Sequence, residues 1–120
     1  MTCRPADLVL IPFPYADLRL SKKRPVLVLT TPDQHGDFIA LAVTSVQPPE
    51  YALEIDPASL ASGALPRRSW VRQGKVFTLG EDDIVKALGR VTPGFLRAVL
   101  DGLCERVGYT MLPSGNRDRH

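Results

Sequence analysis

The feature that most constrains the fold is a series of short apolar runs, each of which ends at residues typical of turns. The run at 7–14 ends at its own prolines, "PDQHGD" at 32–37 has the composition of a hairpin turn, and "QPPE" at 47–50 ends the preceding run. The expected strands are residues 7–14, 24–31, 38–46, 51–55 and 69–79, with 89–91 as a further short one. Five or more short strands joined by hairpin turns favour a small, mainly β, antiparallel barrel or half-barrel.

One helix stands out near the end of the chain. Thr92 is a suitable N-cap, Pro93 fits the first turn, and Gly108 ends the segment. Apolar side chains recur between these limits at helical spacing: Phe95, Leu96, Val99, Leu100, Leu103, Cys104 and Val107. We therefore expect an amphipathic C-terminal helix that packs one face onto the sheet.

Three shorter irregularities are also expected. Residues 56–63 have the composition of one helical turn, with Asp56 as its N-cap and Gly63 at its end. Residues 80–88 are a candidate for a brief helix. Gly74 interrupts an otherwise regular strand, which indicates a kink or a β-bulge at that position.

Length and composition fit one globular domain. Of the 120 residues, 44% are hydrophobic and 23% are charged, so one modest core is expected within residues 1–108, followed by a disordered tail at 109–120. The N-terminus lacks a signal-peptide pattern, and no apolar run approaches the length of a membrane span. The cytoplasm, without membrane contact, is the expected location.

The cysteines and histidines do not indicate a metal site. Two cysteines are too few for a disulfide framework, and no pair of cysteines or histidines has zinc-ligand spacing. Cys3 is expected near a loose terminus, and Cys104 is expected to be buried and inert on the helix face. The sequence predicts neither a metal nor another cofactor.

Positive charge is concentrated in two segments, although the formal net charge is only +2. Residues 1–24 contain five cations and two carboxylates, and residues 67–75 contain four cations and no carboxylate. Two basic segments in a nearly neutral chain predict an anionic ligand on one face.

Arg24 and Thr44 are the residues most suited to chemistry on such a ligand. Arg24 starts a strand, and a guanidinium binds phosphate bidentately and stays charged. If residues 24–31 and 38–46 pair through the turn between them, Thr44 lies beside Arg24. The alternatives are a cation that keeps the strand end soluble and a threonine chosen for its β-propensity.

Other polar residues allow two interpretations each. His35 is a general base by its ordinary pKa, but a solvated turn histidine is the preferred interpretation because it lies at the far end of the hairpin. Asp17 could pair with Lys22 or Lys23 or orient a ribose hydroxyl. Burial in the core is preferred to base stacking for Trp70, and an anionic helix cap is preferred to a metal site for residues 81–83.

With these residues in place, the chain resembles the MazF/PemK-like toxins of type II toxin–antitoxin modules. The resemblance starts at "DLVLIPFPYADLRLSKKRPVLVLT", continues through "ALAVTSV" and "SWVRQGKVFTL", and reaches the final helix at "LGRVTPGFLRAVLDGL". It covers about residues 6–108. Arg-Pro followed by an apolar strand, with Thr-Ser one hairpin later, is its specific part.

The resemblance implies an SH3-like barrel of the CcdB/MazF type and a homodimer. The implied activity is that of a growth-inhibiting, metal-independent endoribonuclease. It cuts single-stranded RNA at selected sequences to 2′,3′-cyclic phosphate and 5′-hydroxyl ends. Arg24 and Thr44 map to the family's catalytic pair. The expected RNA-binding residues are Lys22, Lys23, Asp17, Ser45, Arg72 and Lys75. A cognate antitoxin would block the RNA groove with an acidic extended segment, and DNA would be contacted only through that antitoxin.

The sequence departs from the family pattern at two places. Many relatives carry Gly-Asp at the start of the first strand, where this chain has Ala6-Asp7, and many carry a Gly- and Glu-containing loop where this chain has "DLRLSKK" at 17–23. Asp17 is the nearest substitute for the acidic residue, so the proton acceptor is left open. Two alternative functions also remain open, a non-catalytic nucleic-acid-binding barrel and a gyrase poison on the same fold.

Overall fold

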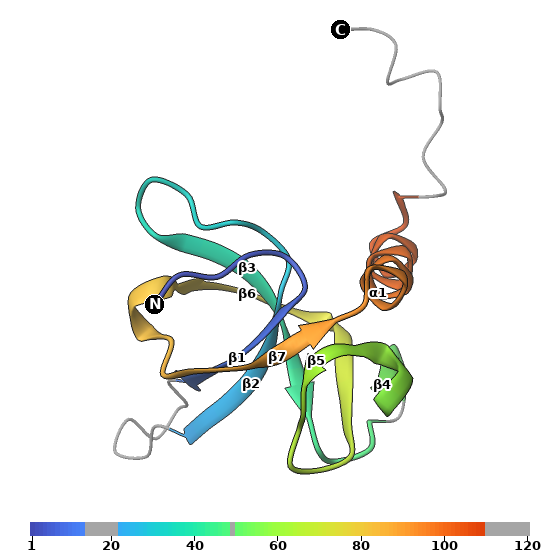
Figure 1. Ribbon diagram of the computed structural model, residues 1–120. Helices are drawn as coiled ribbons and strands as arrows, with labels where there is room; N and C mark the ends of the chain where they lie inside the picture. Colours follow the sequence, from blue (N-terminus) through green and yellow to red (C-terminus); the bar gives the residue numbers. More distant parts are fainter. Residues whose placement is uncertain (14–21, 49, 110–120) are drawn as a thin grey trace, which may run out of the picture.

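The computed structural model describes residues 1–13, 22–48 and 50–109. Within them, seven strands form one antiparallel sheet in the order β4-β6-β3-β2-β1-β7-β5. The strands are β1 (Asp7–Phe13), β2 (Lys22–Val28), β3 (Asp37–Thr44), β4 (Ala52–Ile55), β5 (Leu60–Gly63), β6 (Ser69–Gly80) and β7 (Lys86–Val91). The sheet curls into a half-barrel, and helix α1 (Pro93–Arg106) lies at one side of it (Figure 1). The predicted mainly β fold with a C-terminal helix is confirmed.

Helix α1 has the predicted ends. The Thr92 hydroxyl accepts a hydrogen bond from the Phe95 backbone N–H at 3.1 Å, and Gly108 follows the helix with a φ of 77°. Among the described residues, no helix is both long and apolar enough to cross a membrane.

The expected helical turn at residues 56–63 is wrong in its second half. Asp56 does cap a short 3-10 helix, η1 (Pro57–Ser59), by accepting the Ser59 N–H at 3.0 Å. Leu60 is already extended, and the following residues form β5, which pairs with β7. Pairing with a strand distant in the sequence therefore overrides the local helical signal. The brief helix expected at 80–88 is likewise limited to η2 (Glu81–Asp83).

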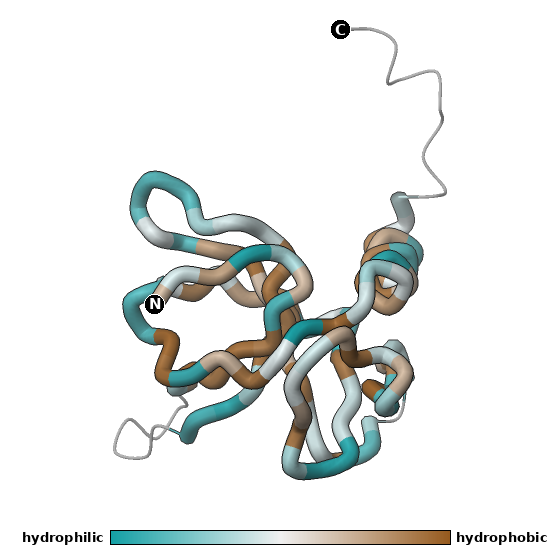
Figure 2. Tube along the Cα trace, viewed as in Figure 1, coloured by the Kyte–Doolittle hydropathy of each residue, from teal (hydrophilic) through white to brown (hydrophobic). Residues whose placement is uncertain are grey.

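Both faces of the central strands are buried. On one face, which we call the helix face, Leu27, Leu41 and Val71 pack with Val99 of α1. On the opposite face, the buried cluster includes Ile11, Val26, Val28, Phe38 and Ala40. Figure 2 shows the corresponding concentration of hydrophobic chain at the centre and of hydrophilic chain at the peripheral turns.

The N-terminal segment is fixed by a β-turn at residues 4–7. The Asp7 N–H donates to the Arg4 carbonyl at 3.1 Å, Pro5 holds the second position, and Ala6 holds the third with a φ of 81°. This is the pattern of a type II turn, whose third position favours glycine. The Arg90 guanidinium pairs with the Asp7 carboxylate and also donates to the Pro5 carbonyl. The turn is thereby joined to β7.

Cys3 lies next to this turn and is buried, so the expected loose terminus is wrong. Its side chain belongs to the hydrophobic cluster on the opposite face. Burial, with smaller contributions from nearby carboxylates, raises the pKa of the Cys3 thiol to about 11. The thiol is therefore protonated and unreactive at neutral pH. Cys104 on α1 is only half-buried.

The bulge predicted at Gly74 is present in β6. Leu41 of β3 faces Val76, but Val43 faces Val71, so two steps along β3 correspond to five along β6. Gln73 within this bulge is buried, and its side-chain amide donates to the Val99 carbonyl of α1 at 3.3 Å. The amide lies directly against Gly102, because a Cβ at that glycine would be 1.8 Å from Nε2. The bulge thus contacts the helix at a position where only glycine leaves room.

Candidate functional site

A row of polar and aromatic side chains crosses the sheet at the start of β2. The β2–β3 ladder ends where Val26 pairs with Ala42, and the same register continued by two residues brings the ends of the two strands, Arg24 and Thr44, to neighbouring positions. Thr44 in turn pairs with Trp70 of β6, and Trp70 pairs with Glu54 of β4. Cross-strand partners point to the same face of a sheet. We call Arg24, Thr44, Trp70 and Glu54 the cross-strand row.

Arg24 is held in place by its surroundings. Its side chain is half-buried, and the Nε atom is inaccessible to solvent. Arg24 lies on the opposite face, two residues before the buried Val26. Its partner on the neighbouring strand β1 is the buried Ile11. A guanidinium does not deprotonate in proteins, so the row starts with a permanent and partly fixed positive charge.

The two lysines before Arg24 are both exposed, but they point in different directions. Side chains alternate along a strand, so Lys22 shares the face of Arg24 and Lys23 projects from the other one. Of the two lysines predicted to bind RNA, the sheet therefore brings only Lys22 to the same face as the cross-strand row.

The Thr44 hydroxyl has a defined position. Its Oγ1 accepts the Val46 N–H at 3.1 Å and donates to the Val46 carbonyl at 3.3 Å. The donated bond is long, so the hydroxyl hydrogen can turn to a bound ligand while the first bond keeps the oxygen in place. Ser45 lies in the bend between these residues and is exposed.

Strand β6 adds further groups to this face. Ser69, Val71 and Gln73 are buried toward the helix face, whereas Trp70 and Arg72 between them are half-buried. Arg72 is therefore on the same face as the cross-strand row. Lys75 is exposed within the bulge that lies opposite Ala42.

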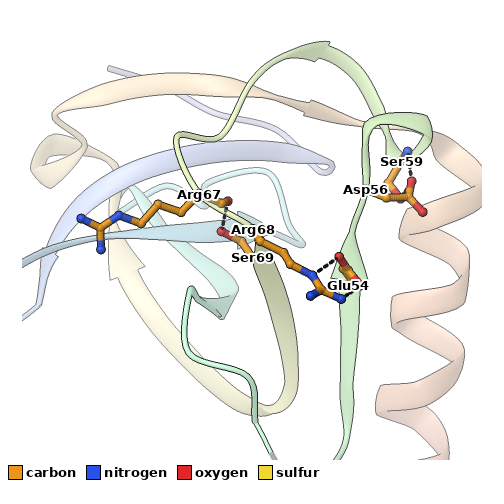
Figure 3. A network of polar contacts seen from close by, with 6 residues as sticks. All are labelled: Glu54, Asp56, Ser59, Arg67, Arg68 and Ser69. Carbon is orange, nitrogen blue, oxygen red and sulfur yellow. Dashed lines mark hydrogen bonds and ion pairs between the residues drawn. The ribbon is translucent and has the colours of Figure 1, made fainter.

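Sequence reasoning missed the arrangement around Trp70, which belongs to neither hydrophobic cluster. The preferred interpretation of a core tryptophan is therefore wrong. The Arg68 guanidinium lies over its ring, with Cζ 5.1 Å from the ring centroid. Arg68 is itself held by Glu54 through two hydrogen bonds of 2.6 and 3.0 Å (Figure 3). The signal in the sequence was the Arg-x-Trp spacing, which places both side chains on one face of a strand.

This ion pair also changes the acidity of its members. The hydrogen bonds from Arg68 lower the pKa of the Glu54 carboxyl, and the same carboxylate raises the pKa of Arg68. Both groups are therefore charged at neutral pH. Their side chains are 38% and 67% exposed, so salt weakens the attraction between them.

An open cleft of about 610 Å³ begins at Glu54 and Arg68. Its walls come from the end of β4, η1, β5 and the loop at 64–68. In Figure 3, Arg67 extends away from Glu54, whereas Arg68 reaches it. The cross-strand row thus leads from Arg24 to the edge of this cleft.

The remaining candidates have different positions. Asp17 lies outside the described residues. His35 is exposed in the turn at the far end of β2 and β3, where the Asp33 carboxylate accepts its backbone N–H at 2.8 Å, as expected of a turn histidine. The hydrogen bond from the Asp37 N–H, and after it the one from the His35 N–H, lower the pKa of Asp33. No group of three or more metal-ligating side chains occurs in the described part of the chain, including residues 81–83.

Comparison with known proteins identifies a family for most of the chain. A family model for the PemK-like, MazF-like toxin of type II toxin–antitoxin systems matches residues 4–107. Comparison with curated proteins finds no similar sequence.

Several solved structures have a similar fold. One is an endoribonuclease in complex with its cognate antitoxin from a mycobacterial species, with a TM-score of 0.71, 19% identity, and coverage of 92% of this chain and 97% of that chain. A Mycobacterium tuberculosis MazF toxin has a TM-score of 0.66 and 15% identity over 84% of this chain and 95% of its own. MazF in a MazE–MazF complex from Deinococcus radiodurans has a TM-score of 0.70 and 21% identity over 88% and 96%. At these identities the likeness concerns the fold.

Proposed function

The chain belongs to the PemK-like, MazF-like toxin family of type II toxin–antitoxin systems, and from this we propose that it is an endoribonuclease. Its substrate is single-stranded RNA, and its reaction needs no metal ion. The observation that supports the proposal is the β2–β3 register through Val26 and Ala42, which, continued to the strand ends, brings Arg24 and Thr44 to neighbouring positions. The endoribonuclease name of similarly folded proteins supports it.

In the proposed reaction, the oxygen of the ribose 2′-hydroxyl attacks the adjacent phosphorus while its proton passes to water, and the 5′-oxygen leaves and takes up a proton from water. The products are a 2′,3′-cyclic phosphate and a 5′-hydroxyl end. Negative charge develops on the non-bridging oxygens, and a guanidinium held in position stabilises it without reorganising. This is the role of Arg24. Threonine is a weak acid, so Thr44 orients the phosphate by a hydrogen bond and is not the proton donor to the leaving oxygen.

The other basic residues bind the RNA strand. Lys22 and Arg72 share the face of Arg24, and Lys75 and Ser45 lie at its border. Lys23 contacts the RNA only where the RNA passes the end of β2. In the proposed assembly the toxin is a homodimer in the cytoplasm, and a cognate antitoxin covers the same basic face with an acidic extended segment. The solved complexes of similarly folded toxins with antitoxins support this partner.

The test is cleavage of mixed-sequence single-stranded RNA in EDTA, with mapping of the cut ends. Arg24→Ala is expected to lower the cleavage rate by about 10²–10³. Thr44→Val, which keeps the shape and removes the hydroxyl, is expected to lower it by about 10–10². Arg97→Ala, on the exposed side of α1, is the matched control and should have no effect.

Discrete cuts with 5′-hydroxyl ends that disappear in Arg24→Ala would support the proposal. A loss below tenfold would remove Arg24 from the catalytic role. RNA that binds at low salt but is recovered intact would instead indicate a binding module without catalysis.

A further inference from the structure

We propose that Trp70 and Arg68 form a nucleobase-stacking site next to the phosphate held by Arg24 and Thr44. The site would take the base of a nucleotide that flanks the scissile bond, and it would contribute to the choice of cleavage sequence. This inference rests on the proposed function, because it assigns a substrate contact to the same face of the sheet.

The position of Trp70 is the first support. Trp70 is the direct cross-strand partner of Thr44, so the two side chains point to the same face. Adjacent strands are about 4.8 Å apart, which places Arg24 about two strand spacings from Trp70. A base attached to a ribose at the scissile phosphate is within reach of an aromatic ring at this distance.

The exposure of Trp70 is the second support. The ring is half-buried and contributes to neither hydrophobic cluster, although its neighbours Ser69 and Val71 are buried. A large aromatic side chain gains most of its stabilising free energy by burial. A tryptophan left partly exposed beside two polar groups of a candidate site therefore has surface available for a ligand.

The way Arg68 is held is the third support. Its guanidinium lies over the Trp70 ring and is fixed by both oxygens of Glu54. Guanidinium planes and aromatic rings are the two surfaces on which proteins stack unpaired RNA bases. Glu54 therefore acts as a positioning residue, because its two hydrogen bonds hold the guanidinium in place while Glu54 itself does not contact the base.

The cleft provides the space. Glu54, the cross-strand partner of Trp70, and Arg68, whose guanidinium lies over its ring, both belong to the wall of the cleft of about 610 Å³. Volumes of about 300–1,000 Å³ are typical of sites for small ligands, so a nucleobase fits. The base enters from the cleft, while its phosphate remains at the Arg24 end of the cross-strand row.

The chain offers a direct spectroscopic test, because Trp70 is its only tryptophan. The probe is a set of short single-stranded RNA oligonucleotides with 2′-O-methyl groups, which bind but lack the attacking hydroxyl. Stacking of a base on Trp70 should quench the tryptophan fluorescence in a saturable way. In Arg24→Ala the quenching should reach the same value at saturation but at a higher RNA concentration, since that variant weakens phosphate binding and leaves the stacking surface.

Variants separate stacking from a structural role. Trp70→Ala should raise KM for cleavage by about 10–10² and relax the cut-site preference, whereas Trp70→Phe should recover much of both. Arg68→Gln should change the preference, and Arg97→Gln on the exposed side of α1 should not, because Arg97 lines neither the cleft nor the cross-strand row. Thermal unfolding of each variant checks that the fold is retained.

The outcomes distinguish this inference from the proposed function. Cleaved RNA without quenching, with an unchanged cut pattern in Trp70→Phe and Arg68→Gln, would overturn the stacking site and leave the endoribonuclease standing. Quenching without any cleavage would support the stacking site and overturn the endoribonuclease.

Discussion

At the scale of single residues, the clearest strain lies in the N-terminal turn. Ala6 has a φ of 81°, in the left-handed region that glycine adopts without cost. Its backbone is fixed from both sides, since its N–H donates to the Val28 carbonyl at 3.0 Å and its carbonyl accepts the Val91 N–H at 2.9 Å. The turn cannot relax without breaking contacts to both β2 and β7.

We therefore expect Ala6→Gly to stabilise the protein. Relief of the left-handed conformation is worth about 1–2 kcal/mol, and loss of the buried methyl group costs about 0.8 kcal/mol. The expected net gain is about 0.5 kcal/mol in the free energy of unfolding, measured by urea titration. The control is Ala98→Gly on the exposed side of α1, which should lose about 1 kcal/mol. Equal losses in the two variants would contradict this explanation.

The residue scale also shows what the sequence could and could not predict. The juxtaposition of Arg24 and Thr44 followed from one hairpin, because a turn between two strands determines which ends meet. The half-exposed position of Trp70 beside Thr44 did not follow, since a strand tryptophan is equally compatible with a core. Only the pairing of β6 with both β3 and β4 shows which face of the sheet Trp70 occupies.

At the scale of elements, the bulge in β6 positions α1. Gln73 places a buried amide against the helix, and Gly102 is the residue that gives it room. The contact joins an irregular part of the sheet to the middle of the helix.

This contact reverses the usual effect of a glycine substitution. Gly→Ala within a helix ordinarily stabilises by about 1 kcal/mol. Gly102→Ala should instead destabilise, because its methyl group displaces the Gln73 amide from the Val99 carbonyl and a buried amide without a partner costs about 1–3 kcal/mol. The control is Gly94→Ala, where the new methyl group meets nothing within 4 Å. Chemical denaturation of both variants would test this, and stabilisation by Gly102→Ala would refute it.

The elements differ in how well the sequence predicts them. The limits of α1 were predictable because the cap, the apolar spacing and the final glycine all lie within the segment. Strand β5 was not, because "DPASLASG" carries a helix-start signal and its strand character depends on pairing with β7. Local sequence signals predict local contacts. Where such a signal conflicts with long-range strand pairing, the pairing determines the secondary structure.

At the scale of the whole molecule, charge is distributed unevenly although the total is only +2. Lys22, Arg24 and Arg72 lie on one face of the sheet, with Lys75 in the adjacent bulge. A local positive field of this kind attracts a polyanion even when the net charge is small.

The proposed RNA contact therefore predicts a strong dependence on salt. With about four phosphate contacts, the logarithm of the binding constant should fall with the logarithm of salt concentration with a slope of about −3. Lys22→Gln should reduce the magnitude of this slope by about 0.7, since one contact is lost. Arg97→Gln on α1 should leave it unchanged. Filter binding of a 2′-O-methyl RNA measures both, and identical slopes in the two variants would place the RNA elsewhere.

The cross-strand row also has a consequence for the chain during its synthesis. Its members come from strands that are far apart in the sequence. Strand β6, which lies between β3 and β4 in the sheet, starts only at Ser69. A nascent chain on the ribosome that has not yet exposed β6 lacks Trp70, Arg72 and the strand that supports Thr44. Contacts this distant in sequence form late in folding. The complete site can therefore form only after well over half of the chain has been translated.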